Sequence, residues 1–95
     1  MIPSNRRPSS SGEILDEEFL KPLGITQTAV ARHIRVPVRP VNEIIRGRRA
    51  ISPETAQLLA AVFGTSARFW MNAQTSYDLA THRIQVKVES LVAAV

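Results

Sequence analysis

The chain has 95 residues, 44% of them hydrophobic, a length that supports one domain with one modest core and excludes a second folded domain. It contains no cysteine, which excludes disulfides, thiolate metal sites and thiol-based redox chemistry. No apolar run approaches the roughly 20 residues of a membrane span, and the N-terminus lacks the apolar segment of a signal peptide. We therefore expect a cytoplasmic protein that has no membrane partner.

Positive charge is concentrated in one part of the chain. The net charge is +4, yet residues 32–49 alone hold six arginines and a single acid, Glu43, a net charge of +5. Guanidinium groups suit bidentate contacts to phosphate and guanine. This stretch therefore indicates a polyanionic partner, with an ordinary solvated surface as the alternative.

The first two elements are an arm and a helix. Residues 1–12 contain two prolines, four serines and two arginines without apolar periodicity, which predicts a flexible basic arm that adds nothing to the core. From Glu13 apolar residues follow a helical pattern until Pro22 and Gly24 break it. The acidic residues at the start of this first helix suit the helix dipole and indicate a solvated face.

Two short helices follow. Thr26 is a suitable N-cap for a second helix over residues 27–34. A third helix, beyond the break at Pro37, ends at Gly47, which we expect to adopt a left-handed conformation. Pro40 is tolerated only in the first turn of a helix, so the start of the third helix stays open.

The last part of the chain predicts two more helices and a tail. Ser52 and Ser66 are suitable N-caps, not nucleophiles, for a fourth helix ending at Gly64 and a fifth ending near His82. Residues 84–89 alternate as a strand does. The prediction is an all-α fold of five helices, with a helical domain over 13–82 and a short tail over 83–95 that is compatible with a strand.

The spacing of the second and third helices is that of a helix-turn-helix. Three or four residues separate them, and Ala31 is small enough for the third helix to cross closely, with Val41 as its inward anchor. The outward face of the third helix then presents Arg39 and Arg46. In this motif the N-terminal half of the second helix enters the major groove.

Several segments together resemble one known family, the HigA/VapI type of antitoxin, in order over roughly residues 12–80. They include Gly12-Glu13-Ile14-Leu15, Pro22-Leu23-Gly24-Ile25-Thr26-Gln27, Val41-Asn42-Glu43-Ile44-Ile45, Gly47-Arg48-Arg49-Ala50-Ile51 and Phe69-Trp70.

The resemblance implies a five-helix lambda-repressor-like fold and a non-enzymatic function without cofactors. It implies an antitoxin of a type II toxin-antitoxin system that binds a palindromic operator as a homodimer, represses its own operon and neutralises a HigB-like toxin that cleaves mRNA. A stand-alone lambda-repressor-like transcriptional regulator without a toxin is the alternative, and a protein-interaction domain with an incidental basic face is a third.

The resemblance also assigns residues. Base contacts fall to Val38, Arg39 and Asn42. Phosphate contacts fall to Gln27, Thr28, Arg46, Arg48 and Arg49. Two positions depart from the family pattern, because Ser10-Ser11 replaces a usual His-Pro and Arg35 stands where a glycine is usual. A left-handed backbone at Arg35 would cost about 1 kcal/mol, and its side chain could alternatively contact phosphate.

Dimerisation is predicted to use the fifth helix and the tail, through Tyr77, Ile84, Val86 and Val88. The tail residues form a one-sided apolar edge that so small a core cannot cover. His33 and His82 are isolated from other ligand side chains, so no metal site is expected. The aromatic pair Phe69-Trp70 is expected to belong to the core and not to a ligand site.

Overall fold

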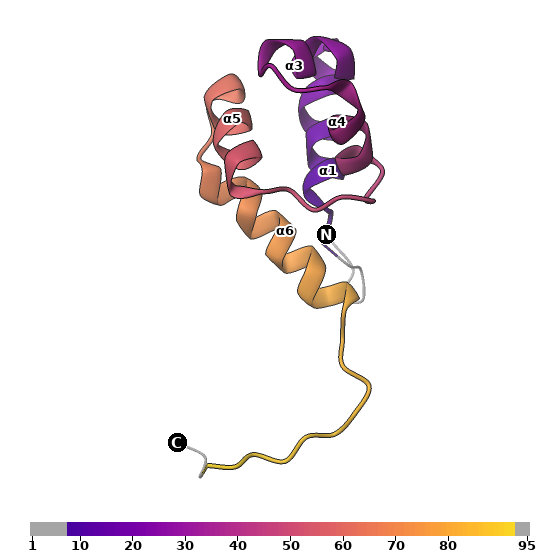
Figure 1. The fold of residues 1–95 in the computed structure, drawn as a ribbon, viewed down its shortest axis with the longest axis vertical. Helices are drawn as coiled ribbons and strands as arrows, with labels where there is room; N and C mark the ends of the chain where they lie inside the picture. Colours follow the sequence, from indigo (N-terminus) through magenta and orange to yellow (C-terminus); the bar gives the residue numbers. More distant parts are fainter. Residues whose placement is uncertain (1–7, 93–95) are drawn as a thin grey trace.

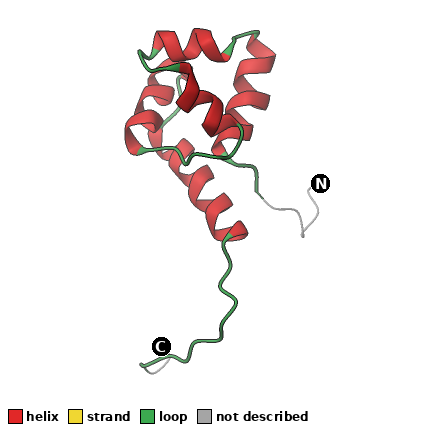
Figure 2. Cartoon of the chain, turned by 45° about the vertical axis from the view of Figure 1, so that its right-hand side comes forward, coloured by secondary structure: helices red, strands yellow, loops and turns green. Residues whose placement is uncertain are grey.

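Helices cover most of residues 8–92, the part of the chain that this computed structural model describes, and no residue in that range forms a strand (Figure 2). The first helix is continuous and consists of α1 (Ser11–Ile14), the π-helical segment η1 (Leu15–Leu20) and α2 (Lys21–Leu23). The other helices are α3 (Gln27–His33), α4 (Val38–Ile45), α5 (Pro53–Phe63) and α6 (Ala67–Thr81) (Figure 1). Over residues 8–92 the predicted five-helix fold is confirmed. None of these helices combines the length and apolar character that a membrane crossing needs.

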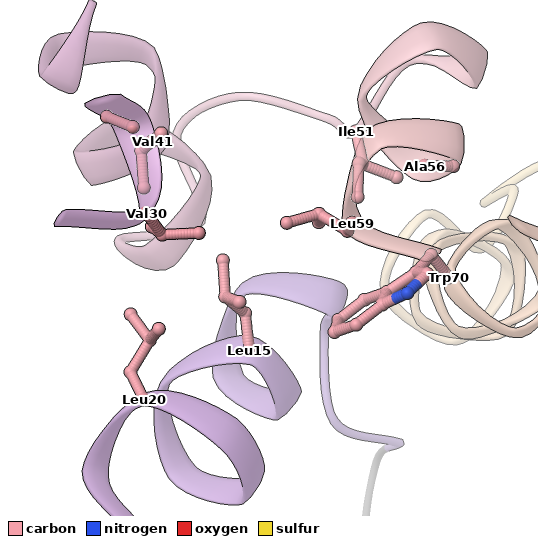
Figure 3. Packing of buried hydrophobic residues seen from close by; sticks show 9 residues of the cluster. Leu15, Leu20, Val30, Val41, Ile51, Ala56, Leu59 and Trp70 are labelled. Carbon is pink, nitrogen blue, oxygen red and sulfur yellow. The ribbon is translucent and has the colours of Figure 1, made fainter. Parts of the chain in front are cut away.

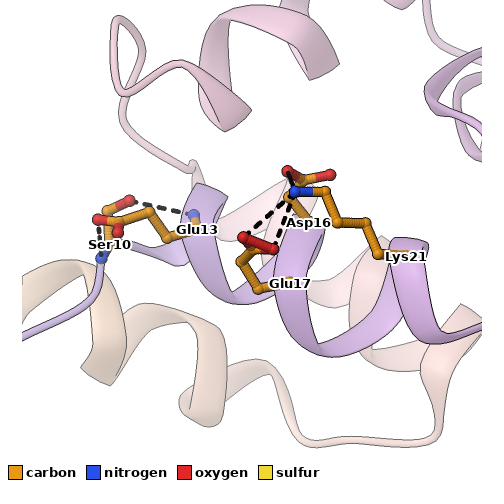
Figure 4. Close-up of polar contacts among 5 residues, drawn as sticks. All are labelled: Ser10, Glu13, Asp16, Glu17 and Lys21. Carbon is orange, nitrogen blue, oxygen red and sulfur yellow. Dashed lines mark hydrogen bonds and ion pairs between the residues drawn. The ribbon is translucent and has the colours of Figure 1, made fainter.

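The first helix begins earlier than predicted. Ser10 is its N-cap and forms a reciprocal capping box with Glu13 (Figure 4): the Ser10 Oγ accepts from the Glu13 N–H at 3.1 Å, and the Glu13 Oε1 accepts from the Ser10 N–H at 3.2 Å. Ser11 is fully buried, and its Oγ donates to the carbonyl of Trp70 at 2.8 Å. The prediction that residues up to 12 add nothing to the core is therefore wrong for 10–12, whereas residues 1–7 of the arm lie outside the described part.

Gly12 brings the first helix into direct backbone contact with α4. A Cβ at this position would overlap the carbonyl oxygen of Ile44 and lie 2.8 Å from the Cα of Ile45. Only glycine permits this approach. The packing of α1 on α4 therefore depends on a residue that composition alone had placed in the arm.

The π-helical segment explains the spacing of the apolar residues in the first helix. Leu15 and Leu20 are 1% and 2% exposed although they are five positions apart, a spacing that in an α-helix would separate them by about 140°. In η1 the hydrogen bonds run from residue i to i+5, as in the bond from the N–H of Lys21 to the carbonyl of Asp16. Both leucines therefore face the core.

The core lies between the first helix, the helix-turn-helix and the α5–α6 pair (Figure 3). Trp70 is fully buried at its centre, and its Nε1 donates to the Thr65 Oγ1 at 2.7 Å. Phe19 packs against Trp70 and Phe63 with ring centroids 5.2 Å and 4.9 Å apart. This confirms that Trp70 belongs to the core. The prediction is wrong for Phe69, which is 41% exposed and packs on the edge of the core with its ring centroid 5.1 Å from that of Trp70.

The predicted helix caps are confirmed. The side chains of Thr26, Ser52 and Ser66 accept hydrogen bonds from backbone N–H groups in the first turns of α3, α5 and α6. Gly47, just beyond α4, has the left-handed φ of 74° that we expected.

The tail does not form the strand that its alternation predicted. All residues from 83 to 92 are exposed, and they run away from the helices as an extended segment (Figure 1). A single extended segment has no neighbouring strand with which to exchange backbone hydrogen bonds. The alternation of Ile84, Val86 and Val88 therefore produces an exposed apolar edge and no sheet.

Candidate nucleic-acid interface

α3 and α4 form the predicted helix-turn-helix. Ala31 and Val41 are 2% and 4% exposed at their crossing, as the small residue and the inward anchor should be. α4 starts at Val38, with Pro37 as its N-cap. Pro40 is then the third residue of the helix, where its missing N–H leaves no helical hydrogen bond unmade. The open question of where this helix starts is thus resolved.

Arg35 lies in the turn with a left-handed backbone, φ 62°, unlike any other described residue except glycine. Two backbone hydrogen bonds close the turn. The N–H of Arg35 donates to the carbonyl of Arg32 at 3.2 Å, and the N–H of Val36 donates to the carbonyl of Ala31 at 3.0 Å. A side chain in this conformation costs about 1 kcal/mol relative to glycine. Arg35 is exposed, and it lines a pocket with His33 of α3 and Leu58 of α5.

The beginning of α4 presents the residues expected to face bases. The Arg39 side chain is 85% exposed, and Val38 is an exposed apolar residue beside it. Asn42, one turn further on, is half-buried, and its Nδ2 donates to the Gln27 Oε1 at 3.1 Å. This bond joins the first residue of α3 to the outward face of α4, while Thr28 next to it is exposed.

The loop after α4 continues this surface. Arg46, Arg48 and Arg49 are all exposed, and Arg48 is anchored through its backbone, since its N–H donates to the Glu43 carbonyl at 2.8 Å. The eight predicted DNA-contacting residues thus come from only three segments, the start of α3, the body of α4 and the loop that follows it. We define their surface as the basic face.

Glu43 lies within the basic face and was not among the predicted site residues. It pairs with Arg49 at 2.8 Å and with Arg39 at 3.4 Å. The Arg49 guanidinium holds the pKa of the Glu43 carboxyl below its usual range. The signal was present in the sequence, because Arg39 and Glu43 are four residues apart on one helix.

The other candidate residues lie on other elements, although Tyr77 and His82 line a pocket together with Arg48 and Arg49 of the basic face. His33 and His82 are exposed, and within residues 8–92 no group of three or more potential ligands could hold a metal ion. Tyr77 is half-buried on α6, while Ile84, Val86 and Val88 in the tail are 76%, 69% and 72% exposed. The four residues predicted for dimerisation thus belong to the C-terminal part of the chain, one on α6 and three in the tail.

Comparison with known proteins supports this geometry. The helix-turn-helix family model matches residues 17–70. The chain is 47% identical over 68 residues to virulence-associated protein I of Dichelobacter nodosus, a match that spans 72% of this chain and 63% of that protein. A structure of Pseudomonas aeruginosa antitoxin HigA with the higBA promoter is similar with 48% identity and a TM-score of 0.76, over 79% of this chain and 82% of that one. A structure of antitoxin GraA in complex with its operator has 37% identity and a TM-score of 0.83, over 98% and 100% of the two chains.

A short helix, a tight turn and a second helix with an exposed basic N-terminal half define a helix-turn-helix domain. The chain belongs to the helix-turn-helix family, and within it to the HigA/VapI type of antitoxin. This family is non-enzymatic, in agreement with the sequence.

Proposed function

We propose that the protein is the antitoxin of a type II toxin-antitoxin system, that it binds operator DNA as a dimer and represses its own operon, and that it neutralises a HigB-like mRNA-cleaving toxin. The observation that carries the DNA-binding part is the basic face, in which the N-terminal half of α4 is exposed and flanked by arginines. The similarity to HigA with the higBA promoter and to GraA with its operator supports operator binding, and the antitoxin family to which the chain belongs supports the toxin as a partner. Such a protein would act in the cytoplasm, where its operator lies.

The residues of the basic face divide into two roles. Val38, Arg39 and Asn42 lie on the outward side of α4 and are proposed to contact base edges in the major groove. Gln27, Thr28, Arg46, Arg48 and Arg49 lie at the start of α3 and after α4, where they are proposed to contact phosphates on either side.

Two arginine variants test this division on the DNA upstream of the protein's own gene. Arg39→Ala should weaken binding to that DNA by about 1 to 3 kcal/mol and reduce discrimination at one base pair. Arg48→Ala should weaken binding to every sequence and lower the slope of log K against log salt by roughly one. If Arg39→Ala weakened operator and random DNA equally, the base contact would be wrong.

The dimer is proposed to form through Tyr77, Ile84, Val86 and Val88. The tail residues are apolar and exposed in the single chain, so that a second copy could cover them. A two-fold axis would place the two copies of α4 in successive major grooves, about 34 Å apart, on an inverted repeat. Footprinting tests this: inserting about half a helical turn between the half-sites should abolish cooperative protection. A single protected site that is indifferent to the insertion would overturn the dimer.

The toxin is the partner that separates an antitoxin from a stand-alone regulator. We expect the product of an adjacent gene for a small RNase to co-purify with this protein and to lose mRNA cleavage when the protein is added. A chain that represses its promoter and leaves such an RNase active would be the stand-alone regulator instead.

A further inference from the structure

Glu43 is the only acid between Arg32 and Arg49, and it lies in the middle of the basic face. Its side chain is 26% exposed, compared with 85% for Arg39 and 52% for Arg49, so the acid is the least exposed of the three paired side chains. An acid in this place weakens the attraction of the surface for any phosphate. We therefore ask which interaction of Glu43 could offset this weaker attraction for phosphate.

The carboxylate bridges the helix and the loop. One oxygen, Oε2, accepts from the Nε of Arg39 at 3.4 Å, while the other, Oε1, accepts from the Nε of Arg49 at 2.9 Å. The Nη2 of Arg49 approaches the same Oε1 at 2.8 Å. The backbone carbonyl of Glu43 also accepts from the N–H of Arg48, so this residue positions the loop in two ways.

The two arginines are held to different degrees. Arg49 is bound by two short contacts and is the less exposed, whereas the single 3.4 Å contact of Arg39 is weak by the usual geometry of charged hydrogen bonds. Arg39 meets the carboxylate through Nε in a side chain that is 85% exposed, so its Nη1 and Nη2 end is available to DNA. A guanidinium end of this kind can pair with the O6 and N7 of guanine while Nε stays on Glu43.

Binding a phosphate at this site differs from binding guanine. The negative charge of the phosphate would have to approach Glu43 closely, or draw Arg39 or Arg49 away from it, and both cost binding free energy. Guanine is neutral, so it is not repelled by the Glu43 carboxylate. The arrangement therefore disfavours contacts that any DNA can offer relative to contacts that only one sequence can offer.

We propose that Glu43 is a specificity-determining positioning residue of the basic face, which holds Arg39 for base recognition and weakens, without removing, the sequence-independent phosphate contact proposed for Arg49. This inference rests on the proposed DNA-binding function. It concerns a residue that contacts the DNA-binding arginines and not the DNA itself.

The test compares Glu43→Gln with Glu54→Gln, which removes the same charge from an exposed position in the first turn of α5. Both variants are titrated with DNA from upstream of the gene and with random DNA at several salt concentrations. Glu43→Gln should tighten binding to random DNA up to about tenfold near 0.1 M salt, with a steeper salt slope, as one released arginine gains a phosphate. Its operator affinity should rise less, so the ratio of the two affinities falls, whereas Glu54→Gln should leave that ratio unchanged.

A second variant shows whether Glu43 acts through its arginines. In an Arg49→Ala background the gain from Glu43→Gln on random DNA should shrink, because one of the restrained groups is absent. Thermal unfolding of each variant checks that the fold is intact. If Glu43→Gln does not fold, Arg49→Ala still tests the restraint, because the restrained Arg49 should contribute less to binding of random DNA than Arg48, which Arg48→Ala measures. Equal losses from these two variants would overturn the restraint.

Equal changes for Glu43→Gln and Glu54→Gln on both DNAs would overturn the proposal. A wild-type protein that bound both DNAs alike would instead overturn the proposed operator, and the random-DNA arm would still decide whether Glu43 restrains the arginines.

Discussion

Two short segments at opposite ends of the helical domain show opposite behaviour. Residues 10–12 are two serines and a glycine, yet all three are buried. The tail residues Ile84, Val86 and Val88 are apolar, yet each is at least 69% exposed. Hydropathy alone predicts that the tail residues are buried and that residues 10–12 are exposed.

The difference teaches that burial follows from what a segment can contact. Residues 10–12 fit between α4 and α6 because they are small, and because the Ser11 hydroxyl finds a backbone carbonyl there. The tail has no such neighbour in the single chain. Its apolar side chains therefore stay in solvent until another surface covers them.

The largest expected effect comes from Gly12→Ala. The new Cβ would overlap the Ile44 carbonyl, a backbone atom that cannot move without shifting α4, so we expect a loss of about 3 kcal/mol in unfolding free energy. Urea unfolding of the monomer measures it. Gly24→Ala is the control, since a Cβ there has open space and only the left-handed φ of 66° opposes it, at about 1 kcal/mol. Equal losses in the two variants would mean that Gly12 makes no close contact.

A smaller loss is expected from Ser11→Ala. This change removes the 2.8 Å hydrogen bond to the Trp70 carbonyl and should lower the unfolding free energy by about 1 kcal/mol. Ser9→Ala, at an exposed neighbouring position, should change it by less than about 0.5 kcal/mol. If both variants were neutral, the start of the first helix would not be packed on α6.

The smallest effect concerns the tail. At protein concentrations low enough to keep the chain monomeric, Val86→Ala should change the unfolding free energy by less than about 0.5 kcal/mol. The same substitution at Val30, which is 2% exposed, should cost about 2 kcal/mol. A large loss at Val86 in the monomer would show that the tail packs on its own domain, and the contrast between the two ends would disappear.

The fold was predictable where local chemistry decides it. Thr26, Ser52 and Ser66 cap helices through bonds to residues three positions away, and the crossing of α3 and α4 follows from the size of Ala31. The start of the first helix was missed because its Ser-x-x-Glu capping box stands at the end of a serine- and proline-rich stretch. The contact of Gly12 with Ile44 depends on tertiary packing, which no local pattern encodes.

The candidate site divides in the same way. The exposed positions of Arg39 and Asn42 follow from helical periodicity once the helix start is known. The bridging role of Glu43 was not predicted, because it requires the loop to fold back and bring Arg49 within 2.8 Å of the carboxylate. Charge counting identified the basic stretch and its single acid, but not that this acid bridges two of the arginines.

The π-helical segment η1 affects which deletions the first helix can tolerate. Leu15 and Leu20 face the core with four residues between them. Deleting one of those four would leave the leucines four positions apart, which an ordinary α-helix places on one face, about 40° from each other. The same deletion in α5, between Ala56 and Leu59, would turn these two buried residues to nearly opposite sides of the helix. Within residues 8–92, η1 is therefore the stretch of helix in which a relative of this protein could be one residue shorter and still present the same face to its core.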